Sequence, residues 1–470
     1  MNQKIILDAY EKGPEAVVSL FFEVCSQFEK RISELEFQAK KNSKNSHNPP
    51  SMDGLRKPAT KSLREETGRK TGGQPGHTGH TLRQVEHPDR VIVHPVTVCS
   101  CCQSSLENEP VSSKKVRQVF DIPPVSFEVL QHEVERKICP RCLHIEEAPF
   151  PKGVTNATQY GPNVQLMVNY LTQYQYLSLQ RTSEFFQDVY QHSISQGTIN
   201  RLIHSFGESL QEKEEEIRSE ILASPIVHCD ETGLRNQGKT EWVHTYSTPV
   251  FTIQYIHPKR GTIAMDAIGI LPAFTGIAVH DCWKSYFQYD KCQHVLCNVH
   301  LLRELRGIFE QTKQEWAQEM ADFLLKAKHQ KETGRLDAQD LVNLHREYET
   351  ILAKGEEANP IRPKEKNVRG RQKQSLARNL LNRLITHQNS ILAFFLHPAI
   401  PFDNNQAERD IRPVKLRQKT SGSFRSEYGA RNFLRIRSYM STIKKQGKSI
   451  FTCIQEWINT GESDLYPTKT

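Results

Sequence analysis

The sequence has no run of about 18 or more apolar residues, which excludes an ordinary membrane-spanning helix. Its first eight residues, Met1 to Asp8, become charged too early to form the apolar centre of a secretory signal. Internal repeats are also missing, which excludes solenoid and propeller arrays. Eleven cysteines without a secretory signal indicate a reducing compartment, so we expect a cytoplasmic protein.

An excess of acidic charge is missing as well: 62 Lys and Arg stand against 54 Asp and Glu, a net charge of +8. The basic residues gather in two stretches, with nine against three acids over 40–70 and twelve against four over 401–450. A solvated surface is one explanation for such runs. A polyanionic partner is the other, and nucleic acid fits it.

The chain divides by composition and periodicity into six segments. We expect a helix over 1–40, a basic flexible linker over 41–86, a strand-rich module over 87–150, a helical region over 151–223, an α/β domain over 224–425, and a helical element over 426–470.

The first helix carries apolar residues at alternating four- and three-residue steps, at Val17, Phe21, Val24, Phe28 and Leu35. This spacing is typical of a coiled coil that pairs two copies of a chain. An amphipathic helix packed on its own chain fits equally well. The linker that follows is poor in apolar residues and rich in Lys, Asn, Ser, Gly and Pro, so we expect it to be flexible.

The module over 87–150 contains two pairs of cysteines with two-residue gaps. Alternating apolar residues over 116–122 and 126–137 predict strands between the pairs. Such pairs hold structural Zn²⁺ in a tetrahedral site, and the predicted ligands are Cys99, Cys102, Cys139 and Cys142. A reduced pair without metal or a redox motif are the alternatives, and Cys101 leaves the register of the first pair open.

The helical region contains one stretch with the layout of a helix-turn-helix. A helix over 182–189 precedes a turn at Ser195, and Gly197 to Arg201 open a second helix. A plain helical hairpin that supports the next domain is the alternative.

Strands and helices alternate from Ser224 to about Phe309. Three strands over 225–230, 242–247 and 251–257 are followed by a helix, a strand over 276–281, a strand over 294–299 and a helix from His300. Asp230 and Asp281 each end a strand, where ligands gather in open α/β sheets. A capping or surface role is the alternative for each residue alone.

A third acid, Glu408, lies where a helix is predicted to begin. Together with Asp230 and Asp281 it can hold two divalent cations, which clamp the attacking and leaving oxygens of a phosphodiester. The long separation between Asp281 and Glu408 predicts a helical insertion over about 310–398. If the register is different, Glu231 or Asp410 is the ligand instead. These positions favour a ribonuclease-H-like fold for the α/β domain.

Cys297, His300 and Arg303 recur at three-residue steps directly after a predicted strand. His300 can orient a scissile phosphate or carry a proton, and Arg303 can neutralise phosphate charge. A histidine satisfied at a helix start is the alternative. Two ligands alone do not predict a second metal site.

Several motifs along the chain resemble those of the transposases of the insertion sequence 66 family. They include a Lys-Asn-Ser-His-Asn-Pro-Pro-Ser segment from Lys44, Gly-Gly-Gln-Pro-Gly-His from Gly72, Val-His-Cys-Asp-Glu-Thr from Val227, Asp-Cys-Trp-Lys from Asp281, and Asn-Asn-Gln-Ala-Glu-Arg-Asp from Asn404. The resemblance covers nearly the whole length, and the additional Cys101 is a minor departure.

The resemblance implies a DDE transposase with a ribonuclease-H-like core, a zinc-binding module and the catalytic triad Asp230, Asp281 and Glu408. It implies two Mg²⁺ ions, for which Mn²⁺ can substitute, and element ends and target DNA as partners. We also expect a homodimer or higher oligomer on DNA, and small accessory proteins of the same element. The predicted DNA contacts are Arg409, Arg412, Lys415, Arg417, Lys419 and Lys284.

Two other functions fit the same residues. One is a ribonuclease-H-like nuclease that cuts DNA without strand transfer. The other is a zinc-dependent DNA-binding regulator without catalysis, against which an intact set of three carboxylates argues. Cleavage that depends on Mg²⁺ would distinguish either enzyme from the regulator. Transfer of a pre-cleaved end to target DNA would distinguish the transposase from the nuclease.

Overall fold

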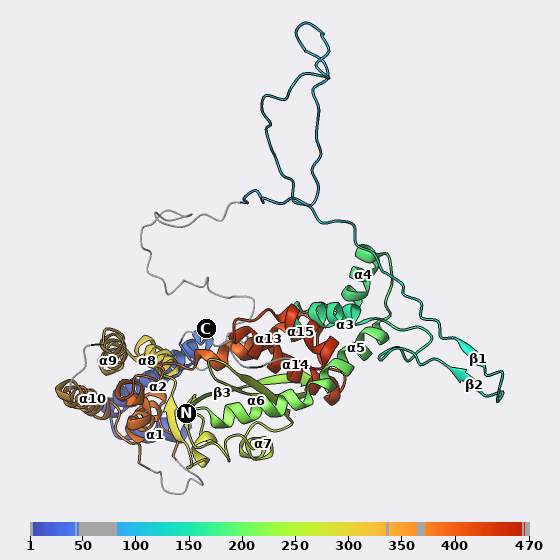
Figure 1. Cartoon of the computed structure of the whole chain (residues 1–470). Helices are drawn as coiled ribbons and strands as arrows, with labels where there is room; N and C mark the ends of the chain where they lie inside the picture. Colours follow the sequence, from blue (N-terminus) through green and yellow to red (C-terminus); the bar gives the residue numbers. More distant parts are fainter. Residues whose placement is uncertain are drawn as a thin grey trace. The chain divides into compact units, whose positions relative to one another are not determined.

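The computed structural model describes residues 3–42, 45–46, 82–334, 338–363, 372–462 and 465 (Figure 1). Contacts divide the chain into two units, one of residues 57–129 and one of all the rest. None of the helices in the described ranges is long and apolar enough to cross a membrane.

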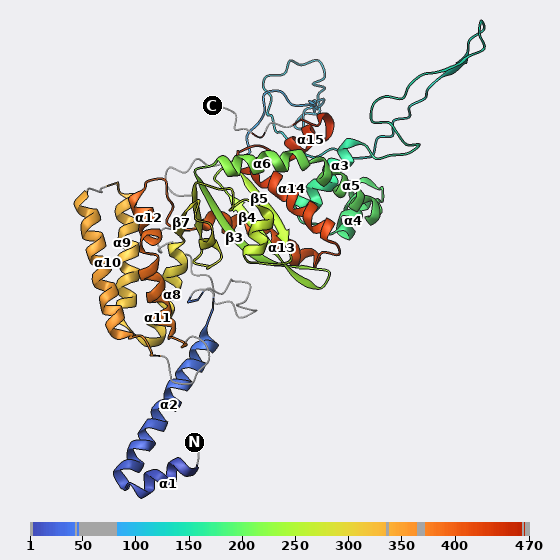
Figure 2. The ribbon, with the colours of Figure 1, turned by 90° about the horizontal axis from the view of Figure 1, so that it is seen from below.

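The centre of the larger unit is a five-stranded sheet in the order β5-β4-β3-β6-β7 (Figure 2). β3 pairs antiparallel with β4 and β4 with β5, whereas β6 and β7 run parallel to β3. The strands are β3 (Ile226–Asn236), β4 (Lys239–Ser247), β5 (Thr252–His257), β6 (Ile277–His280) and β7 (Gln293–Leu296). The predicted succession of strands is confirmed, including the tight turn after Ser247, where Thr248 N–H donates to the Phe251 carbonyl at 2.9 Å.

The predicted end of β3 at Asp230 is wrong, because the strand continues to Asn236. The continuation has β4 as its partner through a hairpin turn at Gln237 and Gly238, both with positive φ. The parallel pairing of β3 with β6 stops earlier, at His228 opposite Val279. An apolar run alone marks the buried part of a strand, so the more polar hairpin arm was missed.

Helices cover the sheet, and the predicted insertion follows β7 and precedes the helix that carries Glu408 in the sequence. Figure 2 shows the insertion beside β7, at one end of the sheet. Helix α14 packs on β5, and α13 packs on β3 and β4. The helices around the sheet are α6 (Gln211–Ala223), α7 (Thr262–Ile268), α13 (Asn405–Ser421), α14 (Glu427–Lys445) and α15 (Ile450–Thr460). Because α14 packs directly on the sheet, the predicted boundary at 425/426 divides elements that belong to one unit.

The insertion is helical, as predicted, and shares one apolar core with the end of the sheet. Buried Val279 and Val295 from the strands pack with Leu301, Trp316 and Phe394 from the helices. The helices of this part are α8 (Asn298–Thr312), α9 (Glu315–Glu332), α10 (Ala338–Ala358), α11 (Leu376–Thr386) and α12 (Gln388–Leu396).

The N-terminal segment forms two helices rather than one, α1 (Gln3–Glu11) and α2 (Pro14–Lys40). Gly13 has a φ of 101°, which an L side chain rarely adopts, and Pro14 fixes the start of the second helix. In the predicted linker, Asn45 is buried and its side-chain amide donates to Glu310 on α8 at 3.1 Å. This part of the linker is therefore bound to the insertion. Most of the remaining linker lies outside the described residues.

The helical region after the module with the cysteine pairs begins with α3 (Pro162–Asn169) and a π-helical turn over 170–174. The predicted pair of helices is present as α4 (Leu179–Tyr190) and α5 (Gln196–Ser209). Gln191 ends α4 in the left-handed region, and the Ser195 hydroxyl accepts the Thr198 N–H at 3.1 Å, capping α5. The layout fits a helix-turn-helix and also a supporting hairpin.

The predicted strands over 116–122 and most of 126–137 are wrong: these residues have no regular secondary structure. Only β1 (Arg136–Ile138) and β2 (Ile145–Glu147) form a ladder near the second cysteine pair. Alternating residues make a strand only where a partner strand supplies hydrogen bonds, and many apolar residues here, such as Val119 and Val129, are exposed. The boundary between units after Val129 also lies inside the predicted 87–150 module.

Candidate active site

Asp230 and Asp281 follow the point where the parallel strands β3 and β6 stop pairing. The last pair is His228 with Val279, and β6 ends at His280. Asp230 Oδ1 accepts the Glu231 N–H at 2.9 Å, and Asp281 Oδ1 accepts the Trp283 N–H at 3.0 Å. These contacts fix both carboxylates at the same edge of the sheet, as strand polarity requires.

Glu408 lies in the first turn of α13, which packs on β3. The start of this helix is fixed by Asn404, a buried residue that sequence analysis did not single out. Its side chain contacts His228 Nδ1 at 2.9 Å and donates to the Cys229 carbonyl at 2.7 Å, and its N–H donates to Cys297 Sγ at 3.2 Å. One residue therefore ties the Glu408 helix to β3 and to the start of α8.

The three predicted carboxylates interact electrostatically. Burial raises the pKa of Asp230 well above its usual value, and the charges of Glu231, Asp281 and Glu408 raise it further. Carboxylates that repel one another in a buried site gain most from a cation. Asp230 on β3, Asp281 just after β6 and Glu408 on α13 therefore bring three negative charges into one region of the structure.

The two alternative ligands, Glu231 and Asp410, are already paired. The Glu231 carboxylate accepts hydrogen bonds from Arg260 Nη2 and from the Tyr286 hydroxyl, both at 2.5 Å. Burial and the charge of Asp281 nevertheless raise the pKa of Glu231 to about 6. Asp410 contacts Lys445 Nζ at 2.6 Å and accepts from the hydroxyls of Ser247 and Thr252. Burial alone would raise the pKa of Asp410, but Lys445 and the hydroxyls hold it below its usual value. This pairing favours Asp230 and Glu408 as the free ligands.

Arg260, which neutralises Glu231, lies between two indole rings. Its guanidinium carbon is 4.2 Å from the centre of the Trp283 ring and 4.8 Å from that of Trp242. Stacking of this kind holds a guanidinium in place while its N–H groups bind a carboxylate. The arrangement leaves no local pattern in the sequence, since the three residues come from separate elements.

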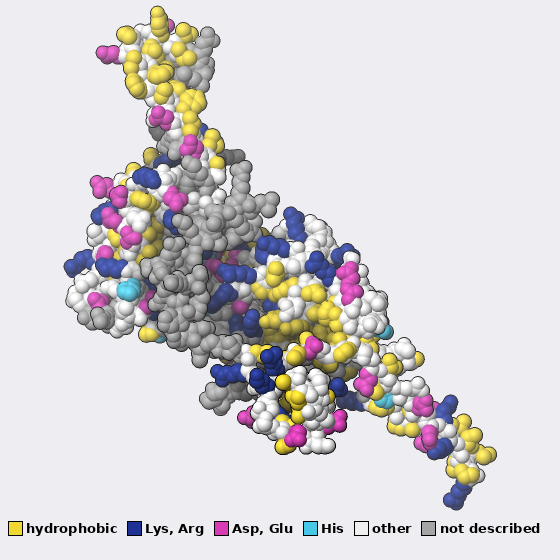
Figure 3. All heavy atoms as spheres, turned by 90° about the horizontal axis from the view of Figure 1, so that it is seen from above, with side chains coloured by type: hydrophobic (Ala, Val, Ile, Leu, Met, Phe, Trp, Pro, Cys, Tyr) yellow, Lys and Arg dark blue, Asp and Glu magenta, His cyan; other side chains and the backbone are white. Residues whose placement is uncertain are grey.

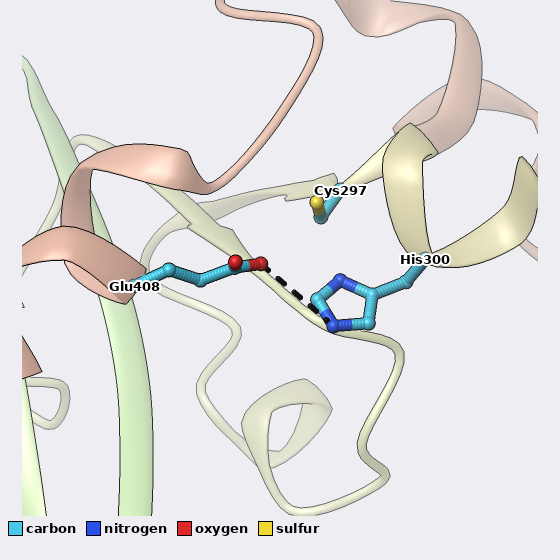
Figure 4. Close-up of side chains that lie close together, drawn as sticks. All are labelled: Cys297, His300 and Glu408. Carbon is cyan, nitrogen blue, oxygen red and sulfur yellow. Dashed lines mark ion pairs between the residues drawn. The ribbon is translucent and has the colours of Figure 1, made fainter. Parts of the chain in front are cut away.

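His300 points toward Glu408, with its Nε2 3.9 Å from Glu408 Oε1 (Figure 4). Cys297 is the N-cap of α8 and lies beside both residues. Burial raises the pKa of its thiol to about 12. Arg303, one turn further along α8, is half-buried and has no hydrogen-bond or ion-pair partner among the described residues. The three-residue spacing thus brings Cys297 and His300 to Glu408.

Within the described ranges, a single set of three acidic, histidine or cysteine side chains has its ligand atoms within 4.8 Å of one another. It consists of Cys297, His300 and Glu408. Asp230 and Asp281 do not form such a set with Glu408. The three carboxylates are therefore spaced more widely than the ligands of one ion.

Behind Asp281, the buried His280 and the half-buried His294 are linked by a hydrogen bond. His280 Nε2 lies 2.9 Å from His294 Nδ1, and His294 Nε2 lies 2.9 Å from the Tyr289 carbonyl. His280 also stacks on Tyr286 at 4.3 Å, and burial lowers its pKa to about 3, so it is neutral. These hydrogen bonds hold the backbone next to Asp281 in place.

The predicted DNA contacts differ in exposure. Arg409, Arg412 and Lys419 are exposed on one face of α13, and Lys284 is exposed three residues after Asp281. Figure 3 shows Lys and Arg side chains gathered in the middle of one face of the molecule.

Two of the six residues make internal contacts instead. The Lys415 ammonium donates to the Gly233 carbonyl of β3, and burial lowers the pKa of Lys415. The Arg417 guanidinium lies 5.5 Å from the Phe424 ring, and burial lowers the pKa of Arg417. Both side chains are half-buried and less available to a ligand than the other four.

The two cysteine pairs have the same local backbone geometry. Cys99 N–H donates to the Ser104 carbonyl and Gln103 N–H to the Cys99 carbonyl, both at 2.9 Å. The second pair repeats this pattern at the same offsets, with Cys139, Leu143 and His144. Gln103 and Leu143, at equivalent positions, both have a positive φ near 60°. By this shared geometry, Cys99 is equivalent in position to Cys139, and Cys102 to Cys142. This favours Cys101 as the cysteine that is not a zinc ligand.

Two of these cysteines have thiols with a lowered pKa. Hydrogen bonds, chiefly from the Ser104 side chain, lower the pKa of Cys102 to about 7. Backbone N–H groups of Cys142 and Arg141 lower the pKa of Cys139. Because thiolates are the metal-binding form of cysteine, these contacts suit zinc.

Comparison with family models gives three matches. Residues 157–432, more than half of the chain, match the model of the IS66 transposase family, which is of the DDE type. The chain belongs to the IS66 transposase family. Residues 97–142, which include both cysteine pairs, match the zinc-finger binding domain of IS66 transposases, and residues 16–83 match a family of unknown function. A search of the curated proteins found no match.

Membership in this family confirms the resemblance noted from the motifs. The matched region covers β3, β6, α8 and α13, so all elements that carry the candidate site belong to the transposase model. The zinc-finger match likewise supports zinc binding by the segment with the cysteine pairs.

Proposed function

We propose that this member of the IS66 family cuts the ends of its insertion sequence and joins them to target DNA, with Asp230, Asp281 and Glu408 as the catalytic residues. The observation that carries the proposal is that α13, tied to β3 through Asn404, brings Glu408 to the edge of the sheet where Asp230 and Asp281 lie, so that the charges of Asp281 and Glu408 act on Asp230. A site of this kind, in a chain of this family, is suited to divalent cations and phosphodiester chemistry.

The strand order supports a ribonuclease-H-like core for this activity. Three antiparallel strands followed by two parallel ones give the order β5-β4-β3-β6-β7. Asp230 lies within β3 just after its pairing with β6 stops, and Asp281 directly follows β6. The helices α8 to α12 interrupt this core before α13 returns Glu408 to it. Thus the long separation of Glu408 from the two aspartates in sequence does not prevent a common site.

The residues fit two Mg²⁺ ions. Glu408 Oε1 is buried and accepts no hydrogen bond, and the charge of Asp230 is opposed by three other carboxylates. Asp230 would contact both ions, and Asp281 and Glu408 would hold one each. When bound, the ions would activate a water or a DNA 3′-hydroxyl and stabilise the departing 3′ oxygen.

The chain's own residues would orient the DNA around this centre. His300, next to Glu408, would contact the scissile phosphate, and Arg303 would neutralise phosphate charge. The exposed Arg409, Arg412, Lys419 and Lys284 would bind the backbone of the flanking DNA. Lys415 and Arg417, being half-buried, would contribute less.

Other parts of the chain have separate proposed roles. Cys99, Cys102, Cys139 and Cys142 would bind structural Zn²⁺, and α4 with α5 would contact DNA as a helix-turn-helix. The exposed Phe21, Phe28 and Leu35 of α2 would pack against a second copy in a coiled coil. Light scattering on the chain with and without DNA tests this dimer, which a Phe28→Glu substitution should dissociate.

The direct test is incubation of the full chain with the ends of its own element and Mg²⁺ or Mn²⁺. We expect nicks that expose the 3′ ends of the element, and joined products when a pre-cleaved end and target DNA are supplied. Cleavage without joined products would favour the nuclease. DNA binding without metal-dependent cleavage would favour the regulator, unless accessory proteins of the element restore activity.

A further inference from the structure

Glu408 is shared between the carboxylate site and a second group of potential ligands. Cys297 at the start of α8, His300 one turn later and Glu408 on α13 have their ligand atoms within 4.8 Å of one another. Figure 4 shows the three side chains directed toward a common space, with His300 Nε2 3.9 Å from Glu408 Oε1. Neither aspartate is part of this group.

The donor atoms differ in kind from those of a magnesium site. Mg²⁺ prefers oxygen ligands in an octahedron, whereas a sulfur, a ring nitrogen and a carboxylate oxygen suit Zn²⁺ and related transition metals. From this donor set we infer that Cys297, His300 and Glu408 form a site for a thiophilic divalent cation of the Zn²⁺ or Co²⁺ type. This site would be separate from the zinc finger.

The sulfur of Cys297 is buried and faces a backbone N–H donor. It is 2% exposed and accepts the Asn404 N–H at 3.2 Å, and Cys297 is the N-cap residue of the fifteen-residue helix α8. N–H groups directed at a thiolate also support the ligands of structural zinc sites. Because burial raises the pKa of this thiol to about 12, the bound cation itself would displace the thiol proton.

The oxygen and nitrogen ligands also suit one ion. Two atoms each bound at about 2.1 Å to a zinc ion lie at most about 4.2 Å apart. The 3.9 Å between His300 Nε2 and Glu408 Oε1 falls within this limit. Glu408 Oε1 is buried without a hydrogen-bond donor, so a cation would satisfy it. Three protein ligands leave a fourth position open to water.

This site would compete with the catalytic one, because both use Glu408. A thiophilic cation held by Cys297 and His300 would withdraw Glu408 from the oxygen-only site formed with the aspartates. Zn²⁺ would therefore inhibit Mg²⁺-dependent cleavage. Inhibition rests on the proposed function, whereas binding of the cation does not.

The binding test counts metal ions on the full-length chain. The zinc finger is first saturated, and the chain is then dialysed to equilibrium against Zn²⁺. The unmodified chain should hold two equivalents of zinc and Cys297→Ala one. In His300→Ala the affinity of the second site for zinc should be at least about 100-fold lower. Cys453→Ala, which removes another buried cysteine on α15, is the matched control and should hold two. A single equivalent on the unmodified chain would overturn the inference, as would a second equivalent retained by Cys297→Ala.

Cobalt adds a spectroscopic test of the sulfur ligand. Co²⁺ added to the chain that carries one equivalent of zinc, in the zinc finger alone, should produce a sulfur-to-cobalt charge-transfer band, with no release of zinc to a chromophoric chelator. The band should be absent in Cys297→Ala and present in Cys453→Ala. Its persistence in Cys297→Ala, or its appearance only as zinc is released, would contradict the site.

The functional test measures DNA cleavage in Mg²⁺ while Zn²⁺ is titrated, with each variant compared with its own zinc-free rate. The half-inhibitory zinc concentration should rise at least about tenfold in Cys297→Ala. An equal half-inhibitory concentration in both proteins would exclude competition through this site. If the unmodified chain cleaves nothing, the proposed function fails, and the metal counts still decide the site.

Discussion

His228 Nδ1 and Asn404 Oδ1 lie 2.9 Å apart, joining the central strand β3 to the residue that begins the Glu408 helix. The two residues are 176 positions apart in the sequence. The amide of Asn404 also donates to the carbonyl of Cys229, the residue directly before Asp230. The position of Glu408 relative to Asp230 thus depends on one buried amide.

Asn404→Ala should therefore impair both folding and cleavage. The change leaves buried groups on His228 and β3 unpaired, at about 1–3 kcal/mol for each group. We expect a lower melting temperature and a roughly 10- to 100-fold loss of DNA cleavage, as for other residues that orient metal ligands. The control is Asn405→Ala, next in sequence and exposed. Equal effects of the two substitutions would show that the Asn404 contacts do not position the site.

Asp230→Asn should stabilise the metal-free chain at neutral pH. Burial and neighbouring carboxylates raise the pKa of Asp230 in the folded state. Its contribution to stability is therefore complete below the unfolded pKa and is lost as pH rises through the folded one. Asparagine carries no charge, so it avoids this loss.

Thermal unfolding without added Mg²⁺ measures the effect, at about 2–4 °C for each kcal/mol. The gain should grow from acidic to neutral pH. Asp290→Asn, at an exposed turn, should leave the melting temperature unchanged. A melting temperature lowered by Asp230→Asn at neutral pH would argue against repulsion at the site.

Glu408→Gln and Asp410→Asn should have opposite effects, although they are two residues apart. Asp410 pairs with Lys445 at 2.6 Å, and breaking a buried pair costs about 3–5 kcal/mol. Asp410→Asn should therefore lower the melting temperature strongly. Glu408→Gln should abolish cleavage without lowering the melting temperature. Loss of cleavage with an unchanged melting temperature in Asp410→Asn instead would make Asp410 the ligand.

Gly307→Ala should release the linker from α8. A Cβ at this position would lie 2.3 Å from the Asn45 carbonyl oxygen, a distance that requires the segment to move. Alanine otherwise stabilises a helix by about 1 kcal/mol relative to glycine. We expect faster tryptic cleavage within residues 40–46 of the folded chain. Gly161→Ala, where a Cβ meets no atom within 4 Å, is the control. Unchanged cleavage would mean that Asn45 is not bound at Gly307.

The first part of β3 and the whole of β6 were predictable because short apolar runs mark them, and Asp230 and Asp281 are the acidic residues that end these runs. The strands over 116–122 and most of 126–137 were predicted wrongly, since alternation does not reveal whether a partner strand exists. Asn404 was missed because its partners, His228 and Cys297, come from distant elements and form no local pattern. The pairing of Glu231 with Arg260 was hidden for the same reason. Long-range contacts of this kind require the fold.

The most direct measurement compares Asp230→Asn with the unmodified chain on the ends of the element in Mg²⁺, with cleavage and DNA affinity measured on the same preparations. A catalytic metal site supplies several kcal/mol of transition-state stabilisation, so cleavage should fall on the order of 10³-fold or more. DNA affinity should be unchanged or slightly higher, since the substitution removes a negative charge. Cleavage by Asp230→Asn at the rate of the unmodified chain would contradict a catalytic role for the three carboxylates.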